Sequence, residues 1–467
     1  MSIFTTIKGW FTVLSKSKAK DEFNIEAIES GKMMEWIKEC VNTYQGNPCW
    51  LDEENHIDTV CFAKAICSET ARLAALGIGI HLDGSARANW LQEQIDKIYF
   101  RLRQWIEYGC AYGTVILKPN VNSIDLYTIG EFEVTSFEDG NIDGIVFHNW
   151  EKNGEKWYTR LEYHRFEDGV YAITNKCYYG DYPDDTRRAV DIKTTPWFMM
   201  DEEAFIQNIE EPLFGVLKMP HANNIDLNSP YGLPIFSEAM QELRDLDIAY
   251  SRNAKEILDS KKVVLLDSDS MIETGAKLAT QTHISLDRKR EQIGLPDYIK
   301  NVRGDGKEMF YQEINPALQT DVRLSGINAL LSQIGYKVGF SNGYFVFNET
   351  TGIQTATGVE AEQQRTIQFI KDIRDQLESC MNGLIYALNV FADLYGLAPA
   401  GKYEAVYDFG DISYNREEDR ARWWSYVIAG KVPAWKFFVK FEGLTEEDAK
   451  AMVEEAAPKT TSLFDEE

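Results

Sequence analysis

The chain has 467 residues, enough for one elaborate domain or for two to four smaller ones. Its formal net charge of −26 argues against a basic surface that grips nucleic-acid phosphates, although DNA could still slide past such a protein. Its seven cysteines, without a Cys-x-x-Cys pair, argue against a disulfide framework or a zinc site, and no apolar run reaches transmembrane length.

The first 120 residues are predicted to be mainly helical. Apolar residues at helical spacing predict a helix that starts near Phe62 and is ended by the glycines of 77–79. A further helix is predicted over 89–108, with Gly109 as its stop signal, and 111–117 is predicted to be a strand. This part of the chain therefore combines helices with at least one strand.

Residues 121–220 are predicted to form an antiparallel meander or a small sandwich. Short runs rich in Val, Ile, Phe, Tyr and Trp alternate there with pairs of residues that favour hairpin turns. The four pairs are Asp139-Gly140, Asp143-Gly144, Asn153-Gly154 and Asp168-Gly169. Pro183-Asp184-Asp185 is expected to make an exposed acidic loop.

Two helices are predicted to bracket a polar insertion. The first covers 234–262 and leads into a strand, and the second covers 316–338 after a returning strand. Both helices carry apolar stripes and polar faces, so Leu331 is expected at a packed contact with a neighbouring chain.

The longest predicted element is a helix of roughly 40 residues, about 60 Å long at 1.5 Å per residue. It opens at a capping box, Thr357 to Glu360, and ends before Gly396, with Gly383 as the expected point of bending. A strand over 403–409 and two short helices, over 415–429 and 445–457, follow it.

The sequence carries none of the common catalytic signatures that we sought. It contains no phosphate-binding Gly-x-x-x-x-Gly-Lys-Ser/Thr loop and no Gly-x-Ser-x-Gly nucleophile elbow. Acidic pairs such as Asp408 and Asp411 are usually solvated in so acidic a chain. We therefore assign no catalytic, cofactor-binding or metal-binding residue, and we do not expect an enzyme.

The order of these parts resembles the portal proteins of tailed bacteriophages, particularly long-tailed phages of Gram-positive hosts. The resemblance covers about 25–457. Its motifs are Tyr231 to Phe236 with Leu243 to Asn253, Thr355 to Glu360, Tyr407 to Asp411, and Asp419 to Trp435 with its Ala429-Gly430-Lys431-Val432-Pro433. Each motif is weak alone, and their order and spacing carry the resemblance.

The resemblance implies an α+β portal fold that assembles into a ring, usually of twelve subunits. Its parts would be an N-terminal wing of helices and an antiparallel β module (1–233), a stem helix (234–262), a clip (263–315), a second stem helix (316–338), a tunnel loop (339–356), a long wing helix with a returning strand (357–411), and a helical crown and tail (412–467). Double-stranded DNA would pass through the ring without sequence-specific contacts.

The same resemblance implies the location and the partners. The ring would sit at the portal vertex of the virion capsid and would assemble in the host cytoplasm. Its partners would be the terminase large subunit, a head-tail adaptor, and the major capsid and scaffolding proteins, without a membrane or a cofactor. The missing phosphate loop fits a packaging ATPase on a separate chain.

Three groups of residues are candidates for function under this hypothesis. The tunnel loop would present Asn342, Tyr344, Phe345, Phe347, Asn348, Glu349 and Thr350 to DNA. The basic residues of the first stem helix that would face the channel are Arg252, Lys255, Lys261 and Lys262. The clip would bind its partners through Arg288, Lys289 and Arg290.

The aromatic residues of the tunnel loop are too apolar for a freely solvated loop. In a ring they would pack on the neighbouring loop or on the channel wall, and the alternative is packing on their own chain. Two other functions stay open: a different head-tail structural protein of a phage, or an enzyme with an unrecognised site in the β module. Particle size separates a ring from a small enzyme.

Overall fold

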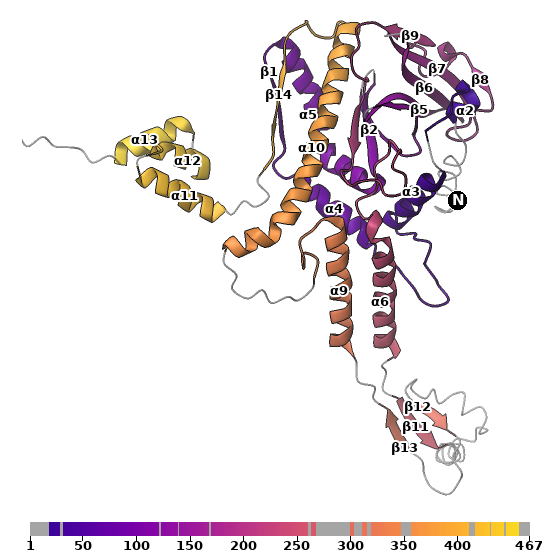
Figure 1. Cartoon of the computed structure of the whole chain (residues 1–467), viewed down its shortest axis with the longest axis vertical. Helices are drawn as coiled ribbons and strands as arrows, with labels where there is room; N and C mark the ends of the chain where they lie inside the picture. The colour runs from indigo at the N-terminus through magenta and orange to yellow at the C-terminus, as the bar shows by residue number, and fades with distance from the viewer. Residues whose placement is uncertain are drawn as a thin grey trace, which may run out of the picture. The chain divides into compact units, whose positions relative to one another are not determined.

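The computed structural model mixes helices with antiparallel sheet and forms two compact units (Figure 1). The first unit is Met1–Ala75 with Ile80–Tyr407, and the second is Leu76–Gly79 with Asp408–Glu467. The residues that the structure describes are 18–28, 31–120, 123–138, 140–167, 170–259, 263–267, 299–302, 311–314, 319–346, 356–410, 416–429, 431–442 and 445–456.

Three helices form the base of the first unit. They are α3 (Gly31–Tyr44), α4 (Phe62–Ala74) and α5 (Ala86–Tyr112). The prediction for α4 is confirmed, whereas α5 is longer than predicted and runs straight through Gly109. The reason is packing, because a Cβ at Gly109 would lie 3.0 Å from Leu217 and 3.1 Å from Met219. The helix ends instead at Gly113, whose φ of +80° favours glycine.

Two sheets form the β-rich part of the first unit. A three-stranded sheet has the order β10-β2-β3, and a six-stranded sheet has the order β4-β5-β6-β7-β8, with β9 also paired to β7. The strands are β2 (Thr114–Pro119), β3 (Ile124–Thr128), β4 (Phe132–Glu138), β5 (Asn141–Asn153), β6 (Lys156–Glu167), β7 (Val170–Gly180), β8 (Ala189–Val190), β9 (Glu203–Ile206) and β10 (Gly215–Lys218). The predicted antiparallel meander is confirmed.

Two predictions in this region are wrong. Asp143-Gly144 is not a turn, since both residues lie inside β5, where Gly144 faces an irregularity in β4. The space explains the glycine, because a Cβ there would lie 2.6 Å from the side chain of Thr135. The acidic loop is not exposed either, since Asp184 and Asp185 are 4% and 2% exposed.

A helix pair leaves the base and returns to it. Helix α6 (Met240–Asp259) follows a short 3-10 turn, η2 (Ser237–Ala239), and α9 (Thr320–Val338) packs against it. Between them lies a three-stranded sheet of order β12-β11-β13, made of Val263–Asp267 (β11), Ile299–Val302 (β12) and Tyr311–Ile314 (β13). The predicted order of helix, insertion and returning helix is confirmed, although α6 begins at Met240 and not at 234.

Helix α10 (Ala356–Leu394) is the long element of the chain, as predicted. Gly396 follows it with a φ of +60°, while the side chains of the predicted capping box lie outside the described residues. Glycine at 383 serves close packing, because a Cβ there would lie 3.1 Å from the backbone oxygen of Phe214.

Two buried arginines attach α10 to the helical base. Arg374 donates to the carbonyl oxygens of Leu73 (3.0 Å) and Ala74 (3.1 Å), which end α4. Arg87, at the start of α5, is 1% exposed and donates to the last turns of α10 and to the segment after it. Its acceptors are Asn389, Asp393, Ala398 and Pro399.

A two-stranded sheet and three further helices complete the described chain. Strand β14 (Glu404–Asp408) was predicted, but its partner β1 (Gly79–Asp83) was not. The second unit contains α11 (Arg416–Ile428), α12 (Ala434–Glu442) and α13 (Glu446–Ala456), whereas the sequence predicted two helices. Phe437 and Phe441 of α12 are buried.

Candidate functional site

The helix pair α6 and α9 is the first candidate surface. Its inner side is closed by Leu243 and Leu246 from α6 and by Ile327, Leu331 and Ile334 from α9, all at most 5% exposed. The sequence placed Leu331 at a contact between chains, but its side chain is already buried within one chain. An inter-chain contact must therefore use other residues of the pair.

Ionic contacts fix the two helices side by side. Lys337 lies 2.6 Å from a carboxylate oxygen of Glu242, and Arg323 pairs with Glu256. Gln333 also donates to Glu242 at 3.2 Å. Because these partly buried pairs repeat along the interface, the register of α6 against α9 is set within one chain.

Each helix also exposes a stripe without charge. On α9, Val322, Ala329 and Tyr336 are seven residues apart and exposed, with 72% of Val322 and 57% of Tyr336 accessible. On α6, Tyr250 and Ile257 are seven residues apart and 51% and 53% exposed, in line with the buried Leu243 seven residues earlier. A seven-residue repeat keeps side chains on one face of a helix, which is the pattern of helix–helix contact. We call these two sets the α9 stripe and the α6 stripe.

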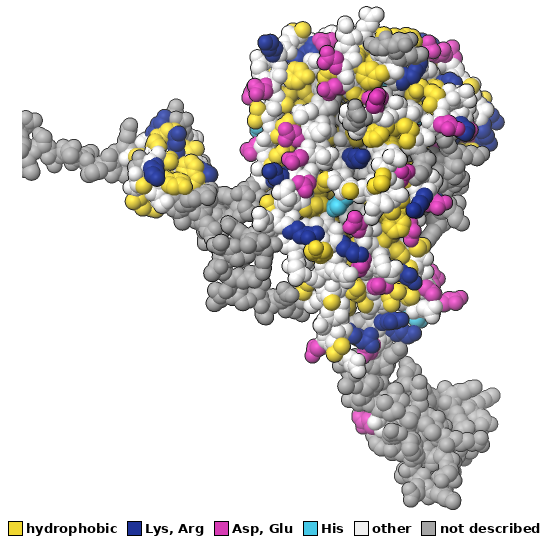
Figure 2. Space-filling view, in the orientation of Figure 1, with side chains coloured by type: hydrophobic (Ala, Val, Ile, Leu, Met, Phe, Trp, Pro, Cys, Tyr) yellow, Lys and Arg dark blue, Asp and Glu magenta, His cyan; other side chains and the backbone are white. Residues whose placement is uncertain are grey.

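Basic residues of α6 lie on another side of the same helix. Arg252 and Lys255 are exposed, and they make no ion pair among the residues that the structure describes. At 100° per residue they lie roughly opposite the α6 stripe. On the face drawn in Figure 2, several basic side chains gather over the far end of the helix pair. Lys261 and Lys262 lie outside the described residues.

The segment after α9 is anchored on the body of the first unit. Gly339 has a φ of +116°, and a Cβ there would lie 2.8 Å from the ring of Phe369 in α10. Phe340 is fully buried, and the backbone N–H of Ser341 donates to Thr366 at 2.8 Å. The first residues of the predicted tunnel loop are therefore fixed.

Tyr344 and Phe345 pack on their own chain. The ring of Phe345 lies 5.3 Å from Phe62 of α4 and 4.8 Å from Phe340. The hydroxyl of Tyr344 donates to Glu69, and 37% of its side chain stays exposed. For these two rings the structure favours the alternative of packing within one chain. Asn342 is exposed beside Ser332, to which it is hydrogen-bonded.

The remaining predicted residues of these groups lie outside the described part of the chain. They are Phe347, Asn348, Glu349 and Thr350 of the tunnel loop and Arg288, Lys289 and Arg290 of the clip. Of the clip, the structure describes the three strands, in which β11 pairs in parallel with β12 and antiparallel with β13.

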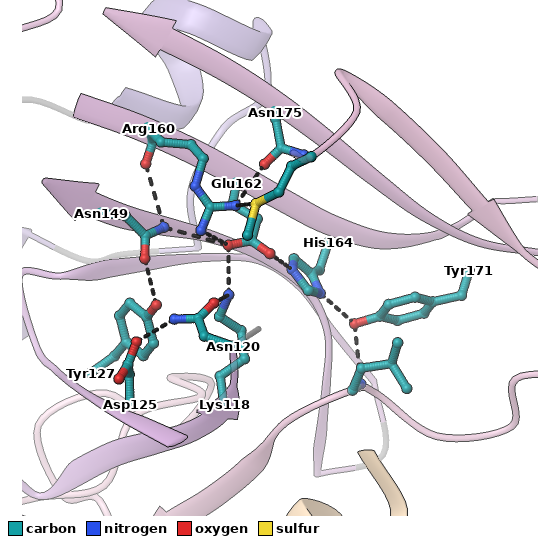
Figure 3. A network of polar contacts seen from close by, with 12 residues as sticks. Lys118, Asn120, Asp125, Tyr127, Asn149, Arg160, Glu162, His164, Tyr171 and Asn175 are labelled. Atoms are coloured by element: carbon teal, nitrogen blue, oxygen red, sulfur yellow. Dashed lines mark hydrogen bonds and ion pairs between the residues drawn. The ribbon is translucent and has the colours of Figure 1, made fainter. Parts of the chain in front are cut away.

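A buried polar network between the two sheets is the second candidate site (Figure 3). The carboxylate of Glu162 on β6 lies 2.5 Å from Lys118 of β2 and 3.1 Å from Arg160. Lys118 and Arg160 are 2% and 1% exposed. Neither charge was singled out from the sequence, because an isolated Lys or Arg in a strand usually faces solvent.

Histidine and tyrosine extend this network. The Nε2 atom of His164 lies 2.9 Å from Glu162, and its Nδ1 atom lies 2.8 Å from the hydroxyl of Tyr171. Because the ionised Glu162 can only accept, Nε2 carries the proton of the neutral ring, and the hydroxyl of Tyr171, which accepts from the N–H of Leu213, donates to Nδ1. Burial lowers the pKa of His164, in keeping with a neutral ring.

The charged side chains of the network shift the pKa values of one another. Burial alone would raise the pKa of Glu162, but Arg160 and Lys118 hold it well below its usual range. Burial lowers the pKa of Lys118, although Glu162 opposes that effect. On the far side, Tyr127 donates to Asn149, whose amide nitrogen lies 3.5 Å from the carbonyl oxygen of Arg160.

This arrangement does not resemble an active site. The acid, base and cations needed for proton transfer are present, but Lys118, Glu162 and His164 are buried and hydrogen-bonded to one another or to neighbouring side chains. The network joins the two sheets through buried ionic contacts, in which Nε of Arg160 is left without a hydrogen-bond partner within the described chain. Among the described residues, no group of His, Cys, Asp or Glu is arranged to hold a metal ion.

None of the helices in the described ranges combines the length and hydrophobicity needed to cross a membrane. No model of a known protein family matches the sequence, and no curated protein matches it either.

Proposed function

We propose that this chain is the portal protein of a tailed bacteriophage, a ring subunit through which double-stranded DNA enters and leaves the capsid. The observation that carries the proposal is the helix pair, whose α6 and α9 stripes are left exposed by a single chain. Stripes on two helices can be covered when the pair of one subunit meets the pair of the next.

The architecture supports the same proposal. A helix pair rises from a mixed α and β base, encloses a small β insertion, and is followed by a loop and a 39-residue helix. This is the order that portal proteins share. The second unit would be the crown, and the first would hold wing, stem, clip and tunnel loop.

The charge of the chain suits a channel that DNA traverses. Twelve chains of net charge −26 would carry −312 (12 × −26) before counterions. Affinity for DNA depends on phosphates neutralised by Lys and Arg, so such a ring binds DNA weakly outside a few basic positions. Arg252 and Lys255, which no acid pairs with in the described chain, are the candidates for brief phosphate contact.

Ring formation is the direct test. Ala329→Glu places a charge in the middle of the α9 stripe without disturbing one chain, since the residue is exposed and glutamate favours helix. We expect the parent to form particles of about 640 kDa (12 × 53.5 kDa) and the variant to form mainly smaller species by light scattering. Lys255→Glu, on the other side of the pair, is the matched control and should still form rings.

A second test addresses DNA passage. The residues of the proposed tunnel loop up to Phe345 pack on their own chain, so we confine the change to 347–355. Replacing 347–355 by a Gly-Ser bridge should leave rings intact and impair packaging or retention of DNA in particles. Full-length genome in particles that carry this deletion would refute a role for the loop.

The main alternative is another structural protein of the phage head-tail junction. It would share the helix stripes but need not surround DNA, so negative-stain images of the purified protein distinguish them by the central channel. The third alternative is an enzyme with an unrecognised site in the β module, and particle size distinguishes a small enzyme from a ring of about 640 kDa (12 × 53.5 kDa).

A further inference from the structure

The two most exposed aromatic side chains among the described residues both lie in the first unit. They are Phe100 in the middle of α5, which is 92% exposed, and Phe205 on β9, which is 62% exposed. A single exposed apolar residue is ordinary on a protein surface, so only its surroundings make it informative. Helix α5 and strand β9 lie apart in the first unit, and one chain leaves both rings in solvent (Figure 1).

Cations surround Phe100 on α5. Residues 97–104 carry Lys97, Arg101 and Arg103 and no acid, and all three side chains are exposed. At 100° per residue, Lys97 and Arg103 lie about 60° to either side of Phe100 around the helix. The acids of this face lie in the preceding turns, at 93 and 96. We call Lys97, Phe100, Arg101 and Arg103 the α5 patch.

Acids surround Phe205 on β9. Glu203 and Phe205 project from one side of the strand, because alternate residues of a strand share a side, and both are exposed. Glu202 precedes them and is exposed too. Neither glutamate makes an ion pair among the residues that the structure describes. We call Glu202, Glu203 and Phe205 the β9 patch.

The β9 patch lies at an edge of the six-stranded sheet. Among the described strands β9 pairs only with β7, where Phe205 is opposite Ala172. Farther along the same face, the sheet is covered by α2 (Lys18–Phe23), whose Phe23 ring lies 5.2 Å from that of Tyr163. Arg165, opposite Ala172 on β6, stacks on Tyr163 at 5.0 Å. The patch is therefore an acidic and apolar edge that α2 does not reach.

Both patches stand on elements that are fixed from behind. Ile95, Ile98 and Leu102 on the opposite face of α5 are at most 4% exposed. On β9, Ile206 packs against the buried cluster that contains Tyr171. Surfaces that are formed before binding lose little conformational freedom when they bind, so each patch is suited to a specific contact.

The charge of the chain indicates what such a contact would join. At a net charge of −26, two copies repel each other over most of their surfaces. The α5 patch is an exception, because it places three cations around an aromatic ring. The β9 patch places acids around another. The two patches match in charge, and aromatic and arginine side chains are those enriched where proteins meet.

We propose that the α5 patch of one copy binds the β9 patch of the next copy, with Phe100 and Phe205 at the centre of the contact. The inference rests on the proposed function, because a ring brings the flanks of successive chains together, and it adds a second contact to the helix stripes. Since the two patches are different surfaces, one chain can use both at once, each with a different neighbour.

Charge reversal with rescue tests the contact. Lys97→Glu with Arg101→Glu would set acids against acids, and Glu202→Lys with Glu203→Lys would set cations against cations. We expect either pair to raise the chain concentration at half assembly, measured by light scattering near ~0.1 M salt, by at least about tenfold. A chain with all four changes has matching charges again and should assemble within about threefold of the parent. Far-UV circular dichroism checks that each variant is folded.

A zero-length cross-link in the parent identifies the residues. A carbodiimide joins an ammonium and a carboxylate in contact into an amide and takes up the water that is lost. In a mixture of unlabelled and heavy-nitrogen-labelled chains, we expect an amide between Lys97 of one label and Glu202 or Glu203 of the other. Mass spectrometry of the tryptic peptides reads both the residues and the labels.

The outcomes separate this inference from the ring itself. Particles of about 640 kDa (12 × 53.5 kDa) that lack the amide would overturn the contact and leave the ring. A four-change chain that is folded but assembles no better than the reversed pairs would do the same. The amide in open filaments would support the contact and contradict the ring, and a parent that stays monomeric would overturn both. The parent cross-link decides even if a variant fails to fold.

Discussion

Replacing Glu162 by glutamine is expected to be among the most destabilising single changes in the β module. The substitution keeps the shape of the side chain but removes the negative charge that lies 2.5 Å from Lys118 and 3.1 Å from Arg160. Both cations are almost fully buried, so they cannot turn to water. Breaking a buried ion pair by removing one partner costs about 3–5 kcal/mol, and we expect a loss in that range.

The neighbouring cation gives a graded comparison. Lys118→Met removes one partner of Glu162 but leaves Arg160 and His164 to satisfy the carboxylate. The expected loss is smaller, about 1–3 kcal/mol, the cost of an incompletely satisfied buried group. Because the two side chains touch, the double variant should lose less than the sum of the single losses.

Native-state hydrogen exchange of the β5, β6 and β7 amides measures these losses locally, which avoids treating the two units as one transition. The pH dependence adds a second readout. Since the pKa of Glu162 is held below its usual range, its contribution is present above the unfolded value, about 4.3, and is lost as the pH falls through the folded value. A loss below about 1 kcal/mol for Glu162→Gln, or one no larger than for Lys118→Met, would refute the reasoning.

Three further changes test how the first unit is packed. Gly113 and Gly140 both have a positive φ, which strains any other residue. Gly113→Ala should abolish soluble expression, because its Cβ would also lie 2.3 Å from a backbone oxygen. A Cβ at Gly140 would have nothing within 4 Å, so Gly140→Ala should lower the free energy of unfolding by only about 1–2 kcal/mol in a thermal melt. Arg374→Met should lower the protection of the last turn of α4 against hydrogen exchange by about 2–4 kcal/mol, because two carbonyl oxygens lose their donor. Arg87→Lys keeps the charge but cannot span the same acceptors, so we expect a lower melting temperature and a loss of about 1–3 kcal/mol.

The elements that the sequence predicted well are those with a local signal. The spacing of apolar residues predicts helices α4, α9 and α10, and the residue pair Asn153-Gly154 predicts the turn between β5 and β6. Gly109 was wrongly predicted to end α5, because a helix tolerates glycine where a strand packs closely against it. That strand lies about 100 residues later in the chain, so no local pattern indicates it.

The contacts that the sequence did not reveal join distant segments. Strand β1 pairs with β14, more than 300 residues away, and five residues carry too little pattern to predict such a pairing. The buried roles of Arg87 and Lys118 were also invisible, because a charged residue in a helix or strand is usually on the surface. Asp184 was expected in an exposed loop for the same reason.

Of the candidate functional residues, the sequence located the segments better than their surroundings. It identified the loop after α9 and its apolar rings, but the partners of Tyr344 and Phe345 lie on α4, which no local pattern connects to the loop. Arg252 and Lys255 are exposed as expected, whereas Leu331 turned out to close the helix pair itself.

The correction at Leu331 sharpens the argument for assembly. A helix pair that used its whole apolar surface internally would have no reason to associate, but here Leu331 is buried within one chain while uncharged residues of both helices remain exposed. The α6 stripe and the α9 stripe differ in sequence, so covering one with the other joins unlike faces of successive chains. Contacts of that kind are heterologous, and they close into a ring or continue into a filament according to the rotation between neighbours. The size of the particle formed by the parent therefore tests whether the contact closes into a ring. Loss of that particle in Ala329→Glu tests the contact itself.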